Sequence, residues 1–210
     1  MTVIVHHLED SRSQRVLWLL EELGVPYTVK RYERDAVTRL APPELMAIHP
    51  LGKSPVIEVD GVVLAETGAI FDSLLDRFDP SFKLHPGPSD PNFELHRFWI
   101  HYAEGSAMPP LLMKLIMSRL GDAAAPAMVF VNAQIALHAG FQEKTVAKTG
   151  WLVGNGLTAA DIILSFPVEA VAAGGGLSET CPALAAWVAK LHARPAYQRA
   201  LSTGGAYSYA

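Results

Sequence analysis

The sequence has few of the residues on which several large classes of protein depend. Only one of its 210 residues is cysteine, which excludes an internal disulfide, a CxxC redox pair and a cysteine zinc cluster. Charged residues make up 18% of the chain and hydrophobic residues 50%, so wholesale disorder is excluded. The 17 basic residues are outnumbered by 21 acidic ones, and this shortage of positive charge argues against a nucleic-acid partner.

The sequence also lacks a strongly apolar segment of membrane-spanning length. Its longest uncharged stretch, residues 123–142, is rich in alanine and includes Pro126, Asn132, Gln134 and His138, whereas a spanning helix needs about 20 strongly apolar residues. The first ten residues, MTVIVHHLED, have no basic region and only a short apolar run, so we expect no signal peptide. We therefore expect a cytoplasmic protein without a membrane span.

A proline-rich segment divides the chain into two parts of different character. Residues 79–91 hold four prolines and a glycine, which prevent a continuous helix or strand there. We predict an N-terminal domain over 1–80, a linker over 81–91 and a C-terminal domain over 92–210. The fold class is therefore α/β followed by all-α.

The first domain alternates between strand and helix patterns. The expected strands cover residues 3–7, 27–32, 56–59 and 62–64, and the expected helices cover 11–23, 42–48 and 67–78. Asp60-Gly61 is a favoured two-residue hairpin turn between the last two strands. The order predicts a mixed sheet with helices packed against it.

The second domain shows only helical patterns. Long helices are expected over roughly 91–119 and 123–148, with shorter ones after Thr158 and Pro182. Pro109-Pro110 should kink or interrupt the first of these, because proline removes a backbone donor and clashes with the preceding turn. Thr158 and Asp161 form a capping pattern, so Asp161 is predicted to be structural.

Three junctions of the first domain carry the residues suited to chemistry. Ser11 and Gln14 fit a capping box, but a hydroxyl at a helix N-terminus is also suited to stabilise an anion. Ser54-Pro55 opens a strand after a glycine-containing loop, as either a cis or an ordinary trans turn. Thr67 is a candidate N-cap of a helix whose N-terminus could bind a carboxylate.

The order and spacing of these motifs resemble the glutathione S-transferase family, in particular its serine-type fungal and bacterial members. The resemblance extends over nearly the whole chain. It is carried by residues 11–15, by LWLLEEL at 17–23, APPEL at 41–45, IHPLGKSP at 48–55, YAEGSAMPPL at 102–111 and DIILSFP at 161–167. It implies a thioredoxin-like N-terminal domain, a helical C-terminal domain and a homodimer.

The resemblance also implies roles for individual residues. Ser11 would hydrogen-bond the glutathione sulfur, and the residue before Pro55 would bind the cysteinyl part of the tripeptide through its backbone. Glu66 and Thr67 would hold the γ-glutamyl end, and Lys53 would reach the glycyl carboxylate. Ser13 is an alternative hydroxyl to Ser11. His49, where many members have asparagine, has no assigned role.

The second substrate would bind beside the helical domain. Candidate residues for an apolar electrophile site are Tyr102, Ser106, Met108, Met113 and Met117, although apolar residues at helical spacing are more often core. Cys181 is expected to be structural. The eight histidines show no metal-binding spacing, so no metal is expected.

The implied function is glutathione transfer, with glutathione as cosubstrate. Its thiolate would attack small hydrophobic electrophiles. Two alternatives stay open: glutathione-dependent peroxide reduction or isomerisation on the same thiolate, and a non-catalytic glutathione-binding or regulatory module.

Overall fold

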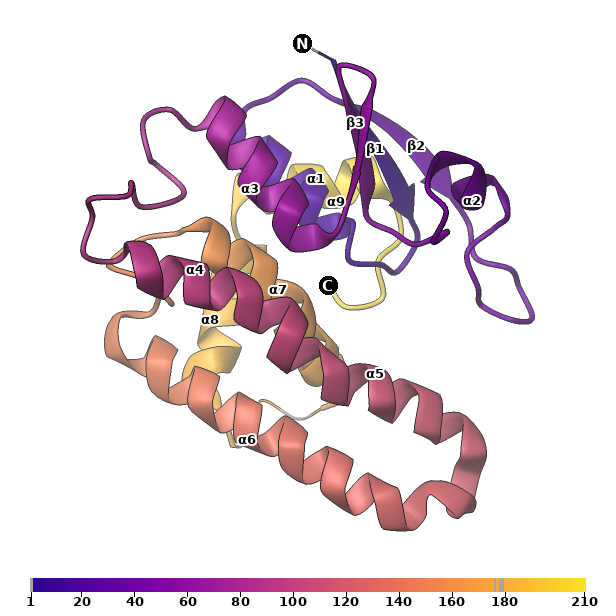
Figure 1. The fold of residues 1–210 in the computed structure, drawn as a ribbon. Coiled ribbons are helices and arrows are strands. Elements are labelled where there is room, and N and C mark those ends of the chain that lie inside the picture. Colours follow the sequence, from indigo (N-terminus) through magenta and orange to yellow (C-terminus); the bar gives the residue numbers. More distant parts are fainter. Residues whose placement is uncertain (1, 176, 178–179) are drawn as a thin grey trace. The chain divides into compact units, whose positions relative to one another are not determined.

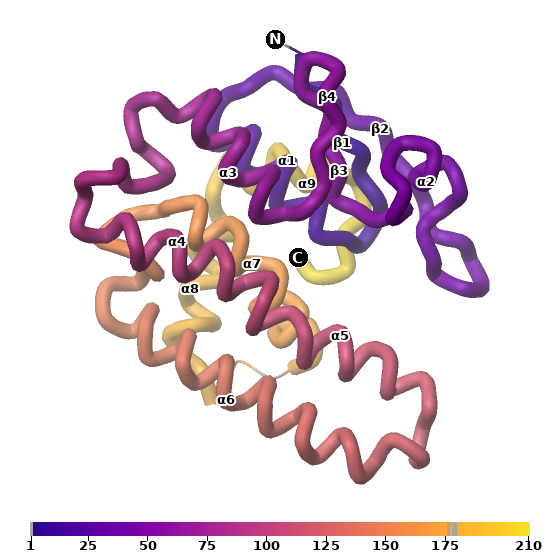
Figure 2. The backbone as a smooth tube through the Cα atoms, viewed as in Figure 1, coloured from indigo at the N-terminus to yellow at the C-terminus, as the bar shows by residue number. Residues whose placement is uncertain are grey.

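The computed structural model describes residues 2–175, 177 and 180–210, and they form two compact units. The first unit comprises residues 2–84, 192–208 and 210. The second comprises the described residues between His85 and Leu191, together with Tyr209. Figures 1 and 2 show the path of the chain through both units.

The first unit is built around a four-stranded sheet. Its elements are β1 (Val3–Leu8), α1 (Gln14–Leu23), β2 (Thr28–Tyr32), α2 (Glu44–Ile48), β3 (Val56–Val59), β4 (Val62–Ala65), α3 (Thr67–Phe78) and α9 (Pro195–Gly204). The strand order is β2-β1-β3-β4. Strand β1 is parallel to β2 and antiparallel to β3, which confirms the predicted mixed sheet.

The hairpin between β3 and β4 forms where the sequence predicts it. Val59 pairs with Val62 across the turn, and both turn residues, Asp60 and Gly61, have positive φ. Positive φ at both positions is the geometry that matches the twist of the two strands.

The core of the first unit lies around α1. Residues 14–20 of this helix are all buried, and α1 packs against β1, α3 and α9. Figure 1 shows α1 and α3 on one side of the sheet and α2 on the other. Because α1 contacts both the sheet and two helices, its N-terminus is held in a fixed place.

The last helix, α9, is fastened to α1 by polar and aromatic contacts. Arg194 donates to both carboxylate oxygens of Glu22, at 2.6 and 2.9 Å, and Trp18 Nε1 also donates to Glu22. The rings of Trp18 and Tyr197 meet edge to face at 5.1 Å. Residues 192–208 therefore group with the first unit, although the proposed domain boundaries assign them to the helical part.

The second unit is helical. Its elements are α4 (Phe93–Tyr102), a π-helical segment (Ala103–Ala107), α5 (Met108–Met117), a 3-10 segment (Ser118–Ala124), α6 (Ala125–Thr149), α7 (Ala159–Ala173) and α8 (Pro182–His192). The expected interruption at Pro109-Pro110 takes the form of the π-helical segment, and the prolines occupy the first turn of α5. A proline is tolerated there because the first helical N–H groups have no intrahelical acceptor.

The predicted capping box at the start of α7 is confirmed. Asp161 Oδ2 accepts from the N–H of Thr158 at 2.9 Å and from its hydroxyl at 3.0 Å. Asp161 Oδ1 accepts from the Leu152 N–H and from Trp187 Nε1, each at 3.1 Å. The carboxylate thus ties the start of α7 to the preceding loop and to α8.

One helical stretch, Phe93–Thr149, is long and apolar enough to cross a membrane by length and composition. Only 11% of its apolar window is buried in the structure.

Candidate functional site

The register of the sheet brings two distant loops together at one end of β1. His6 on β1 is paired with Val56, the first residue of β3, so the loop before β3 lies next to the loop after β1. Ser54 Oγ donates to the His6 carbonyl at 3.3 Å, and it lies 3.3 Å from Ser11 Oγ. Residues 43 positions apart thereby form one site.

Ser11 lies in the turn that leads into α1 and is 5% exposed. Its hydroxyl accepts from the Ser13 N–H at 3.2 Å and lies 2.7 Å from Ser13 Oγ. The helix begins only at Gln14, and its first turn over residues 14–17 contains no acidic side chain. The positive end of the α1 dipole therefore faces this turn without a competing carboxylate from that helix turn.

The predicted capping box between Ser11 and Gln14 is wrong. The structure places the N-cap at Ser13 rather than Ser11. Both polar atoms of the Gln14 side chain are buried without a hydrogen-bond partner among the described residues. The physical reason is that the chain turns at 11–13 to reach Ser54, so Gln14 points into the core instead of back to Ser11.

The Ser54-Pro55 peptide bond is cis, as the family resemblance implies. Ser54 and Pro55 are both buried. Lys53, one residue earlier, is exposed. His49 is half-buried, and its Nδ1 accepts from the Leu51 N–H at 3.4 Å, so the histidine shapes the loop before Lys53.

The start of α3 provides a second helix N-terminus. Its N-cap is Glu66, which has a positive φ of 70°, and Thr67 is the first helical residue. The prediction of Thr67 as N-cap is therefore off by one residue. Thr67 is buried, whereas Glu66 is exposed, so the pair offers a hydroxyl, free N–H groups and a carboxylate.

The candidate electrophile residues occupy one helical stretch of the second unit. Tyr102 ends α4, Ser106 belongs to the π-helical segment, and Met108, Met113 and Met117 lie on α5. Tyr102 is buried, and its hydroxyl is 2.6 Å from His138 Nδ1. Burial raises the pKa of Tyr102 to about 12 and lowers that of His138, so both groups are neutral at pH 7.

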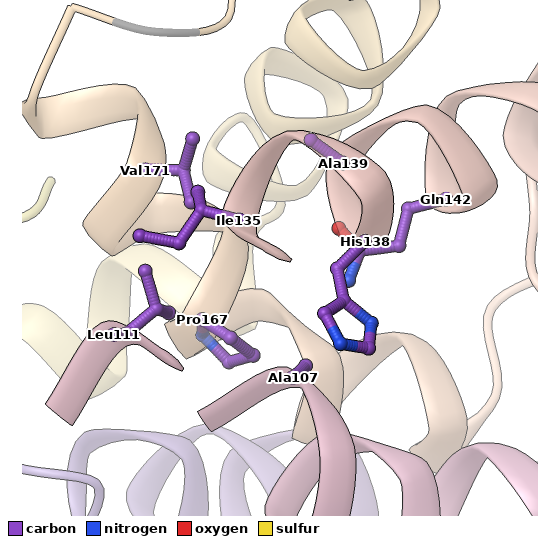
Figure 3. Close-up of a pocket in the computed structure, with 8 residues that line it drawn as sticks. All are labelled: Ala107, Leu111, Ile135, His138, Ala139, Gln142, Pro167 and Val171. Atoms are coloured by element: carbon purple, nitrogen blue, oxygen red, sulfur yellow. The ribbon is translucent and has the colours of Figure 1, made fainter. Parts of the chain in front are cut away.

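A small cavity lies beside this stretch, within the second unit (Figure 3). It is lined by Ala107, Leu111, Ile135, His138, Ala139, Gln142, Pro167 and Val171, and none of the five candidates is among these described lining residues. Its volume of about 10 Å³ is that of one water position. The cavity is too small for an organic electrophile.

Sequence reasoning missed His7 as part of the site. His7 is buried, and its Nδ1 is 2.8 Å from Ser13 Oγ. The alternation of side chains along β1 places His7 and His6 on opposite faces of the sheet. His6 is bound to Tyr32 and Glu58. The signal available in the sequence was a histidine near the end of an expected strand, two residues before the polar segment that begins at Glu9.

The remaining reactive side chains do not form a further centre. Cys181 is buried, and its sulfur accepts from the Thr180 hydroxyl at 3.7 Å. In the part of the chain that the structure describes, no group of three or more histidine, cysteine or acidic residues could hold a metal ion.

The mixed sheet, the cis proline at one end of β1 and the two helix N-termini define a thioredoxin-like domain, here followed by a helical one. Family models described as the N-terminal and C-terminal domains of glutathione S-transferase match residues 1–75 and 113–201. The chain therefore belongs to the glutathione S-transferase family.

Relatives and solved structures agree with this assignment. Glutathione S-transferase 1 of Saccharomyces cerevisiae is 34% identical over 215 residues, which cover 92% of this chain and 91% of the yeast protein. Glutathione S-transferase 3 of Schizosaccharomyces pombe is 33% identical over 80% of this chain and 74% of its own length. A crystal structure of a glutathione S-transferase from Actinobacillus pleuropneumoniae has a TM-score of 0.88 at 34% identity, covering 98% of this chain and 94% of that one.

Proposed function

We propose that the protein binds glutathione and transfers it to small hydrophobic electrophiles, with Ser11 as the residue that stabilises the thiolate. The observation that carries this proposal is the position of the Ser11 hydroxyl, at the N-terminal end of α1 and 3.3 Å from Ser54 Oγ. A free thiol has a pKa of about 8.5 and is mostly protonated at neutral pH. A hydroxyl donor and a helix dipole both favour the ionised form.

The tripeptide has two carboxylates and one ammonium group, and the residues around Ser11 match this charge pattern. The backbone of Ser54, before Pro55, binds the cysteinyl part. Glu66 attracts the γ-glutamyl ammonium, while Thr67 and the free N–H groups of α3 hold the adjacent carboxylate. Lys53 reaches the glycyl carboxylate.

The chemical step needs only the thiolate and an electrophile. The thiol proton goes to solvent water, and the sulfur electron pair forms the new bond to carbon while a halide or other leaving group departs. Tyr102, Ser106, Met108, Met113 and Met117 are the proposed contacts for the electrophile. Methionine suits a pocket for varied apolar molecules because its side chain adapts in shape.

The working form is proposed to be a cytoplasmic homodimer that binds neither membranes nor nucleic acid. Support for the dimer comes from large apolar side chains exposed on α5 and α6, such as Leu112, Leu115, Ile116, Val129 and Phe130. Light scattering should give about twice the chain mass of 22.7 kDa, and a Phe130→Lys variant should be monomeric. Monomeric wild-type protein, or its flotation with phospholipid vesicles, would contradict this assignment.

Steady-state kinetics test the catalytic proposal. With an aryl halide at pH 6.5, Ser11→Ala should lower kcat by about 10- to 100-fold, the loss of one to two pKa units of thiolate stabilisation. Its KM for glutathione should change by less than about threefold. Glu66→Gln should instead raise that KM about tenfold, because it removes a charge-assisted contact to the tripeptide.

The matched control is Ser118→Ala, an exposed serine whose hydroxyl donates to the Leu115 carbonyl at 2.9 Å. It should leave both constants unchanged. Faster turnover of an organic hydroperoxide than of the aryl halide would favour peroxide reduction. Failure of the wild-type protein to bind glutathione in calorimetry would contradict the proposal and leave a non-catalytic regulatory module.

A further inference from the structure

A chain of hydrogen bonds runs from Ser11 into the interior of the first unit. Ser11 Oγ lies 2.7 Å from Ser13 Oγ, and Ser13 Oγ lies 2.8 Å from His7 Nδ1. The imidazole also hydrogen-bonds the backbone of Gly204, at the end of α9. Ser13 is fully buried, so water does not compete for its hydroxyl.

The surroundings of His7 determine which ring nitrogen carries the hydrogen. Nδ1 is engaged by Ser13, so the bond to the Gly204 carbonyl is made by Nε2–H. In agreement, Nε2 lies 3.3 Å from the point that a Cβ at Gly204 would occupy. Burial and the Arg31 guanidinium lower the pKa of His7 to about 4, so the ring is neutral at physiological pH and Nδ1 is an acceptor.

The groups facing His7 reinforce this state. They are Arg31, which is opposite on β2, Ser13 and the Gln14 amide at the start of α1, and Gly204 on α9. Arg31 is the charged member of this described set, and its guanidinium bonds the Thr203 carbonyl. Because the charged group among these neighbours is a cation, it disfavours a second positive charge on the imidazole of His7.

A neutral His7 whose Nδ1 carries no hydrogen fixes the donor and the acceptor of each hydrogen bond between His7, Ser13 and Ser11. Ser13 must donate its hydroxyl hydrogen to Nδ1, because donation to Ser11 Oγ or to the Leu8 carbonyl, 3.5 Å away, would leave this buried ring nitrogen without a donor. Ser13 Oγ then has only lone pairs to offer Ser11. Ser11 therefore donates to Ser13, and in the absence of a ligand its hydrogen points inward.

We propose that His7 is a positioning residue that acts through Ser13 to hold the Ser11 hydroxyl hydrogen inward, and so limits how strongly Ser11 donates to a bound thiolate. This inference rests on the proposed role of Ser11. When bound glutathione ionises, the S–H bond breaks, the proton passes to solvent and the electron pair stays on sulfur. Ser11 must then turn its hydrogen from Ser13 to the sulfur, giving up one hydrogen bond.

The proposal predicts a gain of thiolate when the inward acceptor is removed. The absorbance of thiolate near 240 nm reports the pKa of glutathione bound to the intact protein. In Ser13→Ala, Ser11 loses its 2.7 Å inward acceptor and keeps only the longer, 3.3 Å contact with Ser54 Oγ. The pKa of the bound thiol should therefore fall by about half a unit to one unit, the equivalent of one net hydrogen bond. Loss of a merely structural serine would not increase ionisation of the ligand.

Two further measurements identify His7 as the origin of the effect. In His7→Asn, the amide oxygen replaces Nδ1 as an acceptor for Ser13, so the pKa of the bound thiol should stay within about 0.3 units of wild type. Independently of any variant, the ¹⁵N shifts of the wild-type protein should show His7 as the neutral Nε2–H tautomer. A raised or unchanged thiol pKa in Ser13→Ala, or an Nδ1–H tautomer, would overturn the proposal.

The variant Ser11→Ala separates this proposal from the one on which it rests. If Ser11→Ala raises the thiol pKa but Ser13→Ala does not lower it, His7 has no positioning role and the function of Ser11 stands. If Ser11→Ala has no effect on the thiol pKa, both proposals fail.

Discussion

Replacement of Asp161 by alanine should strongly destabilise the protein although the residue is far in sequence from the proposed site. Its carboxylate is fully buried and accepts four hydrogen bonds, two on each oxygen. Alanine leaves two buried donors, the Leu152 N–H and Trp187 Nε1, at a cost of about 1–3 kcal/mol each, and removes a helix cap worth about 1 kcal/mol. Burial raises the pKa of Asp161 because an ionised carboxylate is costly to remove from water. Removing the carboxylate relieves this cost, which offsets part of the loss.

The net expectation for Asp161→Ala is a fall of about 4 kcal/mol in the free energy of unfolding. Urea titration followed by tryptophan fluorescence measures it, at one protein concentration because association contributes to apparent stability. Asp122→Ala, at an exposed position, is the control and should lie within about 0.5 kcal/mol of wild type. A change below about 1 kcal/mol in Asp161→Ala would refute the reasoning.

Three other perturbations test the packing. Gly204→Ala should lower the free energy of unfolding in urea by about 1–3 kcal/mol, because the new Cβ would lie 2.5 Å from the buried Gln14 Oε1. Gly140→Ala is the control and should not destabilise, since no described heavy atom lies within 4 Å of its Cβ. Equal effects of the two variants would contradict the packing argument. Burial is the main reason that the pKa of His96 is lowered to about 4. As the pH falls, the unfolded chain therefore binds this proton before the folded one does, and the free energy of unfolding should fall by up to about 3 kcal/mol between pH 6.5 and 4. His96→Leu should reduce this pH dependence of stability, and an unchanged pH dependence would count against the burial argument. A double-mutant cycle on Glu22 and Arg194 should give a coupling energy of about 1–2 kcal/mol in urea unfolding, because the pair is bidentate and partly buried. A coupling energy near zero would show that this ion pair does not hold α9 against α1.

Local patterns in the sequence were sufficient for the elements whose geometry is set by neighbouring residues. The Asp60-Gly61 turn and the capping box of Asp161 both form as predicted, because each depends on contacts within a few residues. The interruption near Pro109 is of the same kind, since proline acts on the turn that precedes it.

Contacts between distant parts of the chain decided the features that the sequence alone did not reveal. The capping pattern at Ser11 was a local signal, but the sheet register holds Ser11 against Ser54 and moves the helix start to Gln14. The contact of His7 with Gly204 depends on the return of α9 to the first unit, which no local pattern encodes.

Titration of the thiol of bound glutathione is the measurement that tests the central claim most directly. In the wild-type protein, we predict a thiol pKa one to two units below the free value of about 8.5. In Ser11→Ala, the pKa should rise by most of that difference. A wild-type value near 8.5, or no change on removal of the Ser11 hydroxyl, would contradict the assignment of Ser11 as the residue that stabilises the thiolate.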